Sequence, residues 1–146
     1  MTATNHTLTG ALVGLTITVP IIALPLAFLL HFVLDSLPHY DNDAHTTRNF
    51  KIMLLMDALL AASVLLLITV VHPGYWWLGV LCGIACASPD LMWFPRWVNE
   101  LRGRPNKPMH IVARFHSRIQ RYATSQNYPY EVVWFIGCGL LLAKLI

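Results

Sequence analysis

The sequence predicts an all-α, multi-pass integral membrane protein in which residues 1–146 form a single membrane domain. Hydrophobic residues make up 56% of the chain and charged residues only 12%, which is too apolar for a soluble domain of this size. Three segments, residues 8–34, 52–71 and 75–92, are long and carry at most one charged side chain each. Because about 20 apolar residues suffice to cross a bilayer as a helix, each segment is a candidate span.

The first apolar stretch, residues 8–34, is interrupted by two prolines and allows two interpretations. One kinked helix would place His6 and His39 on opposite sides of the membrane. Two short helices, near residues 7–19 and 24–37, would place both histidines on the same side. Each half would be about 20 Å long, which is short of the roughly 30 Å hydrocarbon core. We favour a helical hairpin over residues 1–39, because it brings the polar residues together.

A pair of transmembrane helices is expected over residues 50–94. The first helix follows a polar loop at residues 40–49 and ends before a tight turn at residues 72–74. The second helix begins near Tyr75, beside two tryptophans of the kind that are common at membrane–water interfaces.

The next segment, residues 95–128, is basic. Residues 96–121 contain seven lysines and arginines but one acidic residue, whereas the turn at residues 72–74 contains no lysine or arginine. The positive-inside rule therefore places residues 40–51 and 95–128 in the cytoplasm. Apolar side chains at positions 112, 115, 119 and 122 oppose arginines at 114, 118 and 121, which predicts an amphipathic helix in the headgroup layer. A C-terminal helix is expected over residues 129–146, with Pro129 in its first turn.

Ionisable side chains of these helices lie at similar depths below the predicted cytoplasmic surface. At 1.5 Å per residue, His31, Asp57 and Asp90 lie about 9, 10 and 6 Å from the cytoplasmic ends of their helices. His31 and Asp35 also share a helix face, because they are four residues apart. Taken singly, each residue has an ordinary explanation, since a buried histidine or carboxylate often bonds to a neighbouring helix. Taken together, several carboxylates and imidazoles in one layer of low dielectric would be strongly destabilising unless cations or protons compensate their charge.

A divalent metal would provide that compensation. Imidazole and carboxylate ligands suit zinc first, with manganese or iron as alternatives, and the number of candidates would allow one or two ions. A bound metal also lowers the pKa of a coordinated water towards about 7, which permits hydrolysis without a serine or cysteine nucleophile. His72 falls on the opposite side and is excluded. The candidate ligands are His6, His31, Asp35, His39, Asp90 and His116, and the candidate general bases are Asp57, Asp90 and Glu131.

Three short motifs resemble a known family. They are an N-terminal histidine followed by T-x-G, HFVLDSLPH at residues 31–39 and SPDL at residues 88–91. Together they resemble the small prokaryotic membrane-bound proteins described as metal-dependent hydrolases, which implies a place in the prokaryotic inner membrane. The resemblance covers most of the membrane part and favours His6, His31, Asp35, His39 and Asp90 as functional positions. Asp57, His116 and Glu131 are supported by depth and helix faces alone.

Our first hypothesis is a metal-dependent hydrolase that acts on a lipid or a lipid-linked ester or phosphoester at the cytoplasmic face. Arg114 and Arg118 would contact the phosphate of the headgroup, although positive-inside topology also explains them. The second hypothesis is a metal or proton transporter, in which a homo-oligomer could complete the path. The third is a noncatalytic membrane scaffold. Membrane lipids are the expected partners, and no nucleic-acid motif is present.

Overall fold

The computed structural model describes residues 1–41 and 47–146, so the middle of the predicted loop at residues 40–49 lies outside the described residues. The described part is helical, and its one β feature is an isolated bridge between His39 and Ala123. The predicted all-α class is therefore confirmed. The helices are α1 (Ala3–Thr16), α2 (Pro20–Asp35), α3 (Arg48–Val71), α4 (Trp76–Ala87), η1 (Ser88–Trp93), α5 (Phe94–Leu101), α6 (Ile111–Ile119), η2 (Ser125–Asn127) and α7 (Tyr128–Leu145).

Three helical stretches of the described chain are long and apolar enough to cross a membrane: Arg48–Val71, Trp76–Leu101 and Ser125–Leu145. The second comprises α4, η1 and α5 in succession. Large apolar side chains on these stretches are exposed, as expected for surfaces that face lipid. These features support the assignment to integral membrane proteins.

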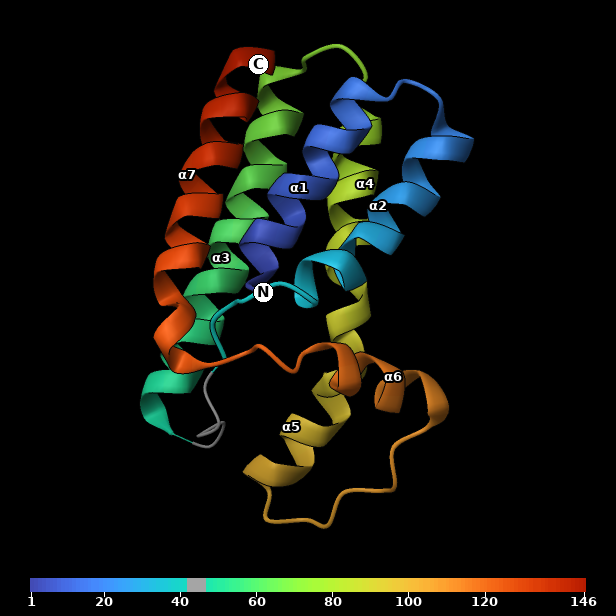
Figure 1. Cartoon of the computed structure of the whole chain (residues 1–146). Helices are drawn as coiled ribbons and strands as arrows, with labels where there is room; N and C mark the ends of the chain where they lie inside the picture. Colours follow the sequence, from blue (N-terminus) through green and yellow to red (C-terminus); the bar gives the residue numbers. More distant parts are fainter. Residues whose placement is uncertain (42–46) are drawn as a thin grey trace.

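The first apolar stretch forms two helices, α1 and α2, joined at residues 17–19. Pro20 begins α2, where its missing N–H costs no helical hydrogen bond, and Pro25 lies within α2 without ending it. Figure 1 shows that the N-terminus lies part-way along the bundle, and that α1 runs from there to one end while α2 returns. With 14 residues, α1 is about 21 Å long, so it occupies only part of the bundle length.

Helix α1 lies between the other helices and packs most closely on α4. A Cβ atom added at Gly10 or Gly14 would overlap the carbonyl groups of Cys82 and Leu78 in α4. Gly79 and Gly83 of α4 face α1 in turn. A Cβ atom added at Gly79 would contact Leu15, and one added at Gly83 would contact Thr7. Small residues spaced by four on both helices let the two backbones approach closely, which is a common way of joining helices in membranes.

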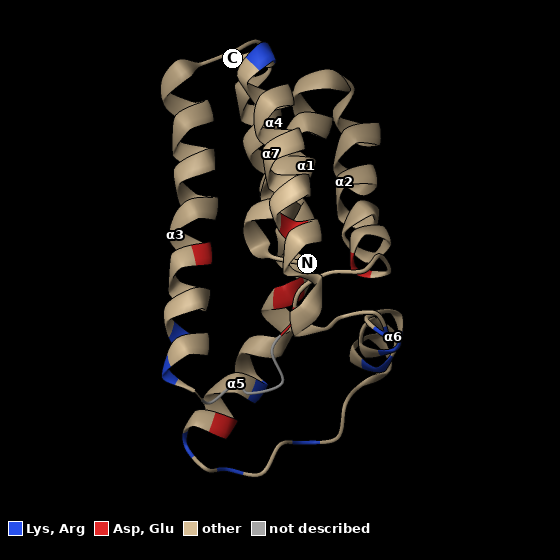
Figure 2. Ribbon diagram, turned by 60° about the vertical axis from the view of Figure 1, so that its left-hand side comes forward, with Lys and Arg blue, Asp and Glu red and all other residues tan. Residues whose placement is uncertain are grey.

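Basic residues gather at one end of the molecule. Figure 2 shows lysines and arginines on α5, on α6, at the start of α3 and on the connection between α5 and α6, with Lys144 at the opposite end. Helix α6 buries Ala113 and His116, whereas Val112, Phe115 and both Arg114 and Arg118 are exposed. The structure thus contains an amphipathic helix in the region predicted to hold one.

The close contact between α1 and α4 makes a prediction about stability. Gly14→Ala should lower the free energy of unfolding in detergent by about 1–3 kcal/mol, because the added methyl group overlaps backbone atoms of α4. Gly137→Ala in α7 is the matched control, since no atom lies within 4 Å of its added Cβ. That control should be neutral or stabilising by up to about 1 kcal/mol, because alanine favours helix over glycine. Equal thermal unfolding of the two variants would contradict the close packing.

Candidate metal centre

His31 and Asp35 project from the last two turns of α2 into the protein and are fully buried. The Nδ1 atom of His31 lies 2.8 Å from the carbonyl oxygen of Cys86 in α4. Because a carbonyl oxygen only accepts hydrogen bonds, Nδ1 carries a proton, and Nε2 is the ring nitrogen that faces the carboxylates of Asp35 and Asp90. This second hydrogen bond orients the ring as the outer partner of a metal-binding histidine does.

Two further side chains reach the same point from other parts of the chain. His116 of α6 brings its Nε2 atom to 2.7 Å from Asp35 Oδ2 and 3.1 Å from His31 Nε2. Asp90 of η1 brings its Oδ1 atom to 3.6 Å from His31 Nε2 and 3.9 Å from His116 Nε2. The four donor atoms of His31, Asp35, Asp90 and His116 all lie within 4.8 Å of one another.

These separations fit a metal ion. Donors around a four-coordinate ion with bonds of about 2.0–2.1 Å lie roughly 3.3 Å apart. The His31 Nε2 to Asp35 Oδ2 distance is 3.3 Å, and the other separations given above lie on both sides of that value. The carboxylates of Asp35 and Asp90 converge there with the Nε2 atoms of His31 and His116, so a cation would be attracted to this point. The cluster could therefore hold a metal ion.

His6 lies on the other side of the two carboxylates. Its Nε2 atom is 3.0 Å from Asp35 Oδ1 and 4.0 Å from Asp90 Oδ2, the oxygens that point away from His116. Its ring stacks on that of His31 with centroids 4.1 Å apart, and the terminal ammonium of Met1 donates to Asp35 Oδ1 at 2.6 Å. Each aspartate therefore directs one oxygen towards the four-residue cluster and the other towards His6.

His39 is buried but does not belong to the four-residue cluster. Its Nδ1 atom donates to the carbonyl oxygen of Leu37 at 2.8 Å, and its own carbonyl oxygen accepts from the backbone N–H of Thr124 at 3.0 Å. Burial lowers the pKa of the His39 imidazole, and the terminal ammonium of Met1 acts in the same direction. The ring is thus neutral at pH 7. His39 lies where the segment after α2 meets the segment before α7.

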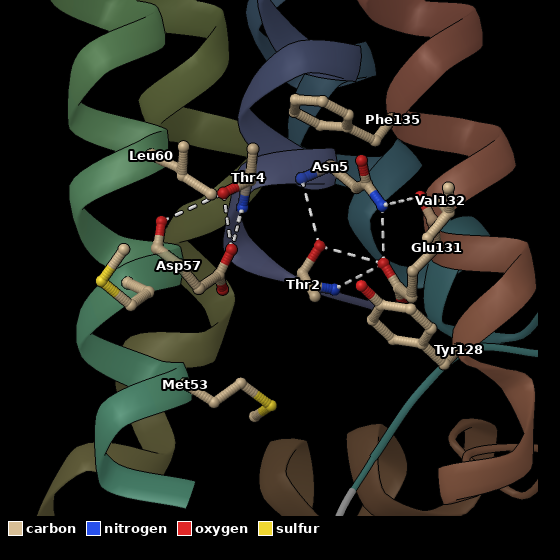
Figure 3. Close-up of a pocket in the computed structure, with 11 residues that line it drawn as sticks. Thr2, Thr4, Asn5, Met53, Asp57, Leu60, Tyr128, Glu131, Val132 and Phe135 are labelled. Atoms are coloured by element: carbon tan, nitrogen blue, oxygen red, sulfur yellow. Dashed lines mark hydrogen bonds between the residues drawn. The ribbon is translucent and has the colours of Figure 1, made fainter. Parts of the chain in front are cut away.

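Asp57 and Glu131, which the sequence nominated as general bases, bind the first turn of α1 (Figure 3). Asp57 accepts from the backbone N–H of Ala3 at 2.7 Å and of Thr4 at 3.0 Å. Glu131 accepts from the backbone and hydroxyl of Thr2 at 3.2 and 2.9 Å. The free N–H groups and positive dipole of a helix N-terminus favour such carboxylates. The sequence analysis noted that a buried carboxylate such as Asp57 often bonds to a neighbouring helix. In the structure, both Asp57 and Glu131 bond to α1 in this way.

Gln120 was missed by the sequence reasoning. Its Nε2 atom donates to Asp35 Oδ2 at 2.9 Å, so it supports the ligand that lies at the centre of the cluster. The spacing contained a usable signal, because Gln120 follows His116 by four residues and must share its helix face.

Arg114 and Arg118 lie on the exposed side of α6, and with Ile111 and Phe115 they border a surface hollow of about 390 Å³.

Comparisons of the chain with family models, with curated proteins and with solved structures find no match. The interpretation of the cluster therefore depends on its own geometry. The predicted ligands His31, Asp35, Asp90 and His116 lie together, His6 adjoins them, and His39 lies apart from the four. His72, which was excluded from the site, ends α3 and is exposed.

Metal analysis tests the cluster. Protein purified in detergent without chelator should retain a divalent metal, and His31→Ala and Asp35→Ala should each lose it, because each removes a donor to the same ion. Gln120→Ala should weaken metal binding by about 10–100-fold, as expected for loss of an outer partner of a ligand. His72→Ala, at an exposed histidine, is the control and should retain wild-type metal content. Unchanged metal in both ligand variants would rule out this site.

Proposed function

We propose that the protein is a membrane-embedded, metal-dependent hydrolase that cleaves an ester or phosphoester of a lipid or lipid-linked substrate at the cytoplasmic face. The observation that carries this proposal is the convergence of four histidine and aspartate donors from three separate parts of the chain. Ionisable residues buried in a membrane protein usually mark a functional site, because they are costly unless used. The motif resemblance to prokaryotic membrane-bound metal-dependent hydrolases points the same way.

Zinc is the proposed metal, because two imidazole nitrogens and two carboxylate oxygens form a donor set that it commonly accepts. Manganese and iron accept similar donors. One ion would be held by His31, Asp35, Asp90 and His116. A second ion on the side of His6 would have to displace the Met1 ammonium, which donates to Asp35 Oδ1 at 2.6 Å. When bound, such an ion supplies Lewis acidity and a nucleophile derived from water at neutral pH.

Substrate would approach from the side of Asp90. The side chain of Asp90 is 24% exposed, whereas those of His31, Asp35 and His116 are fully buried. Asp90 is thus the cluster residue that a substrate reaches first, and it would act as a general base only if it did not bind the metal. The Cys86 carbonyl and Gln120 hold the buried ligands in position on the other side.

Helix α6 would connect the cluster to the lipid surface. It places His116 in the cluster, exposes Ile111 and Phe115, and presents Arg114 and Arg118 beside them. Arginine binds phosphate oxygens through paired hydrogen bonds, so these two residues suit an anionic headgroup. A lipid at this helix would have its headgroup close to a metal ligand.

The proposed orientation places the basic end, with α5 and α6, in the cytoplasm, following the positive-inside rule. Single cysteines can be introduced at Thr18 and Lys107 after the native cysteines are replaced. An impermeant thiol reagent should label Lys107→Cys in inside-out vesicles and Thr18→Cys in right-side-out vesicles. The reverse labelling pattern would show that the basic end lies outside the cytoplasm.

Transport of a metal or proton is the weaker alternative. A transport path needs polar groups across the whole membrane. Residues 8–30, 58–71, 76–89 and 132–143, which form most of the bundle away from the basic end, contain no histidine and no charged residue. The distribution therefore favours a site at one face over a path through the protein.

Assay against a panel of lipids tests the proposed activity. His116→Ala should abolish hydrolysis, because it removes a donor of the cluster. Arg114→Ala combined with Arg118→Ala should raise KM by about 10–30-fold, since each interfacial arginine contributes on the order of 1 kcal/mol towards an anionic headgroup. The exposed pair Arg102→Ala with Arg104→Ala is the control for general charge. Full activity of His116→Ala, or equal effects of the two arginine pairs, would contradict these assignments.

A further inference from the structure

A second site lies across α1 from the metal cluster. It is a pocket of about 400 Å³ between α3 and α7 (Figure 3). Met53, Met56 and Leu60 form one wall, and Val132 and Phe135 form the other. Several of these residues are exposed, so the pocket opens outward between two helices that are candidates to cross the membrane. Its volume is within the usual range for small-molecule sites.

The polar part of the pocket belongs to the first turn of α1 and to the two carboxylates that bind it. Thr2, Thr4, Asn5, Asp57 and Glu131 all line the pocket, whereas no lysine or arginine lines it among the described residues. The threonine hydroxyls already donate their protons, Thr2 to Glu131 and Thr4 to Asp57. Tyr128 adds a hydroxyl group at the start of α7, and Glu131 Oε1 accepts from the backbone N–H of Tyr40 at 3.2 Å. The site therefore combines two carboxylates and their negative charge with apolar walls.

Asn5, which lines the pocket, has a buried side-chain acceptor with no hydrogen-bond partner among the described residues. Asn5 is 1% exposed, and its amide nitrogen donates to Glu131 Oε2 at 2.6 Å and to the Glu131 carbonyl oxygen at 3.0 Å. These two bonds fix which end of the amide is nitrogen, and they leave Asn5 Oδ1 buried without a hydrogen bond among the described residues. A buried acceptor without a partner is costly unless a donor reaches it.

The geometry points to a binding site for the primary ammonium headgroup of a zwitterionic membrane lipid. An ammonium group has three hydrogen-bond donors, no acceptor and a positive charge. It thus complements a pocket that is lined by two carboxylates and, within the described residues, by no lysine or arginine, with the unpartnered oxygen of Asn5 buried beside it. The apolar walls formed by α3 and α7 would contact the upper part of an acyl chain. A phosphate would instead meet two carboxylates, so an anionic headgroup does not suit this position.

This inference is independent of the proposed hydrolysis, because the first turn of α1 separates the pocket from the cluster. Asn5 lines the pocket, while the next residue, His6, faces Asp35 and Asp90. Metal content and lipid selectivity can therefore be measured separately, and either proposal can fail without the other.

The test compares two lipids whose headgroups differ in the number of N–H hydrogen-bond donors. Delipidated full-length protein in detergent is mixed with equal amounts of phosphatidylethanolamine and phosphatidylcholine with matched acyl chains, and bound lipid is measured by native mass spectrometry. The trimethylammonium group of phosphatidylcholine has no N–H donor. Phosphatidylethanolamine should be retained about tenfold more strongly or better, since hydrogen bonds to charged groups are lost with phosphatidylcholine. Equal retention would overturn the inference and indicate ordinary surrounding lipid.

Adjacent residues of α7 provide a matched pair of variants. Val132→Trp should fill the pocket and abolish the preference, because Val132 lines it. Val133→Trp makes the same change at a residue that is 71% exposed and does not line the pocket, so it should keep the preference. Thermal unfolding shows whether each variant is folded. A folded Val132→Trp protein that still prefers phosphatidylethanolamine would place the lipid elsewhere.

Discussion

The buried carboxylate of Asp35 is the group around which the site is arranged. His6 of α1, His116 of α6 and the side chain of Gln120 all contact its two oxygens, and His31 lies one turn before it in α2. A carboxylate without such partners would be strongly destabilising at this depth. The contacts to Asp35 therefore join the N-terminal helices to the basic surface helix, and they also create the concentration of donors that suits a metal ion.

A second constraint is that α1 begins part-way along the bundle. Backbone N–H groups at such a helix start have no water to bind in a membrane interior. Asp57 of α3 and Glu131 of α7 meet this requirement, and the paired glycines hold α1 against α4. The same arrangement fixes His6 beside Asp35 and leaves the pocket beside Asn5. The position of α1 thus determines both sites.

Much of this architecture could be predicted from sequence. Hydropathy located two of the three long helical stretches, Arg48–Val71 and most of Trp76–Leu101, whereas the segment at residues 8–34 forms the two shorter helices α1 and α2. The prolines marked the region where that segment divides. The helix-face and depth arguments placed His31, Asp90 and His116 near one another, because helical rise and periodicity are regular. Depth alone could not separate Asp57 from that group, since residues at one depth can face different neighbours. Pairing of Asp57 and Glu131 with α1 depends on tertiary contacts that no local pattern encodes.

X-ray absorption spectroscopy of the zinc-loaded protein tests the central claim most directly, because it reports the donor atoms around the metal. The account predicts that zinc is bound by nitrogen and oxygen atoms at about 2.0–2.1 Å, with imidazole scattering from His31 and His116. Cys86 lies beside the cluster through its backbone carbonyl, so no sulfur is expected. A zinc–sulfur shell at about 2.3 Å, or a shell without imidazole, would contradict the proposed centre.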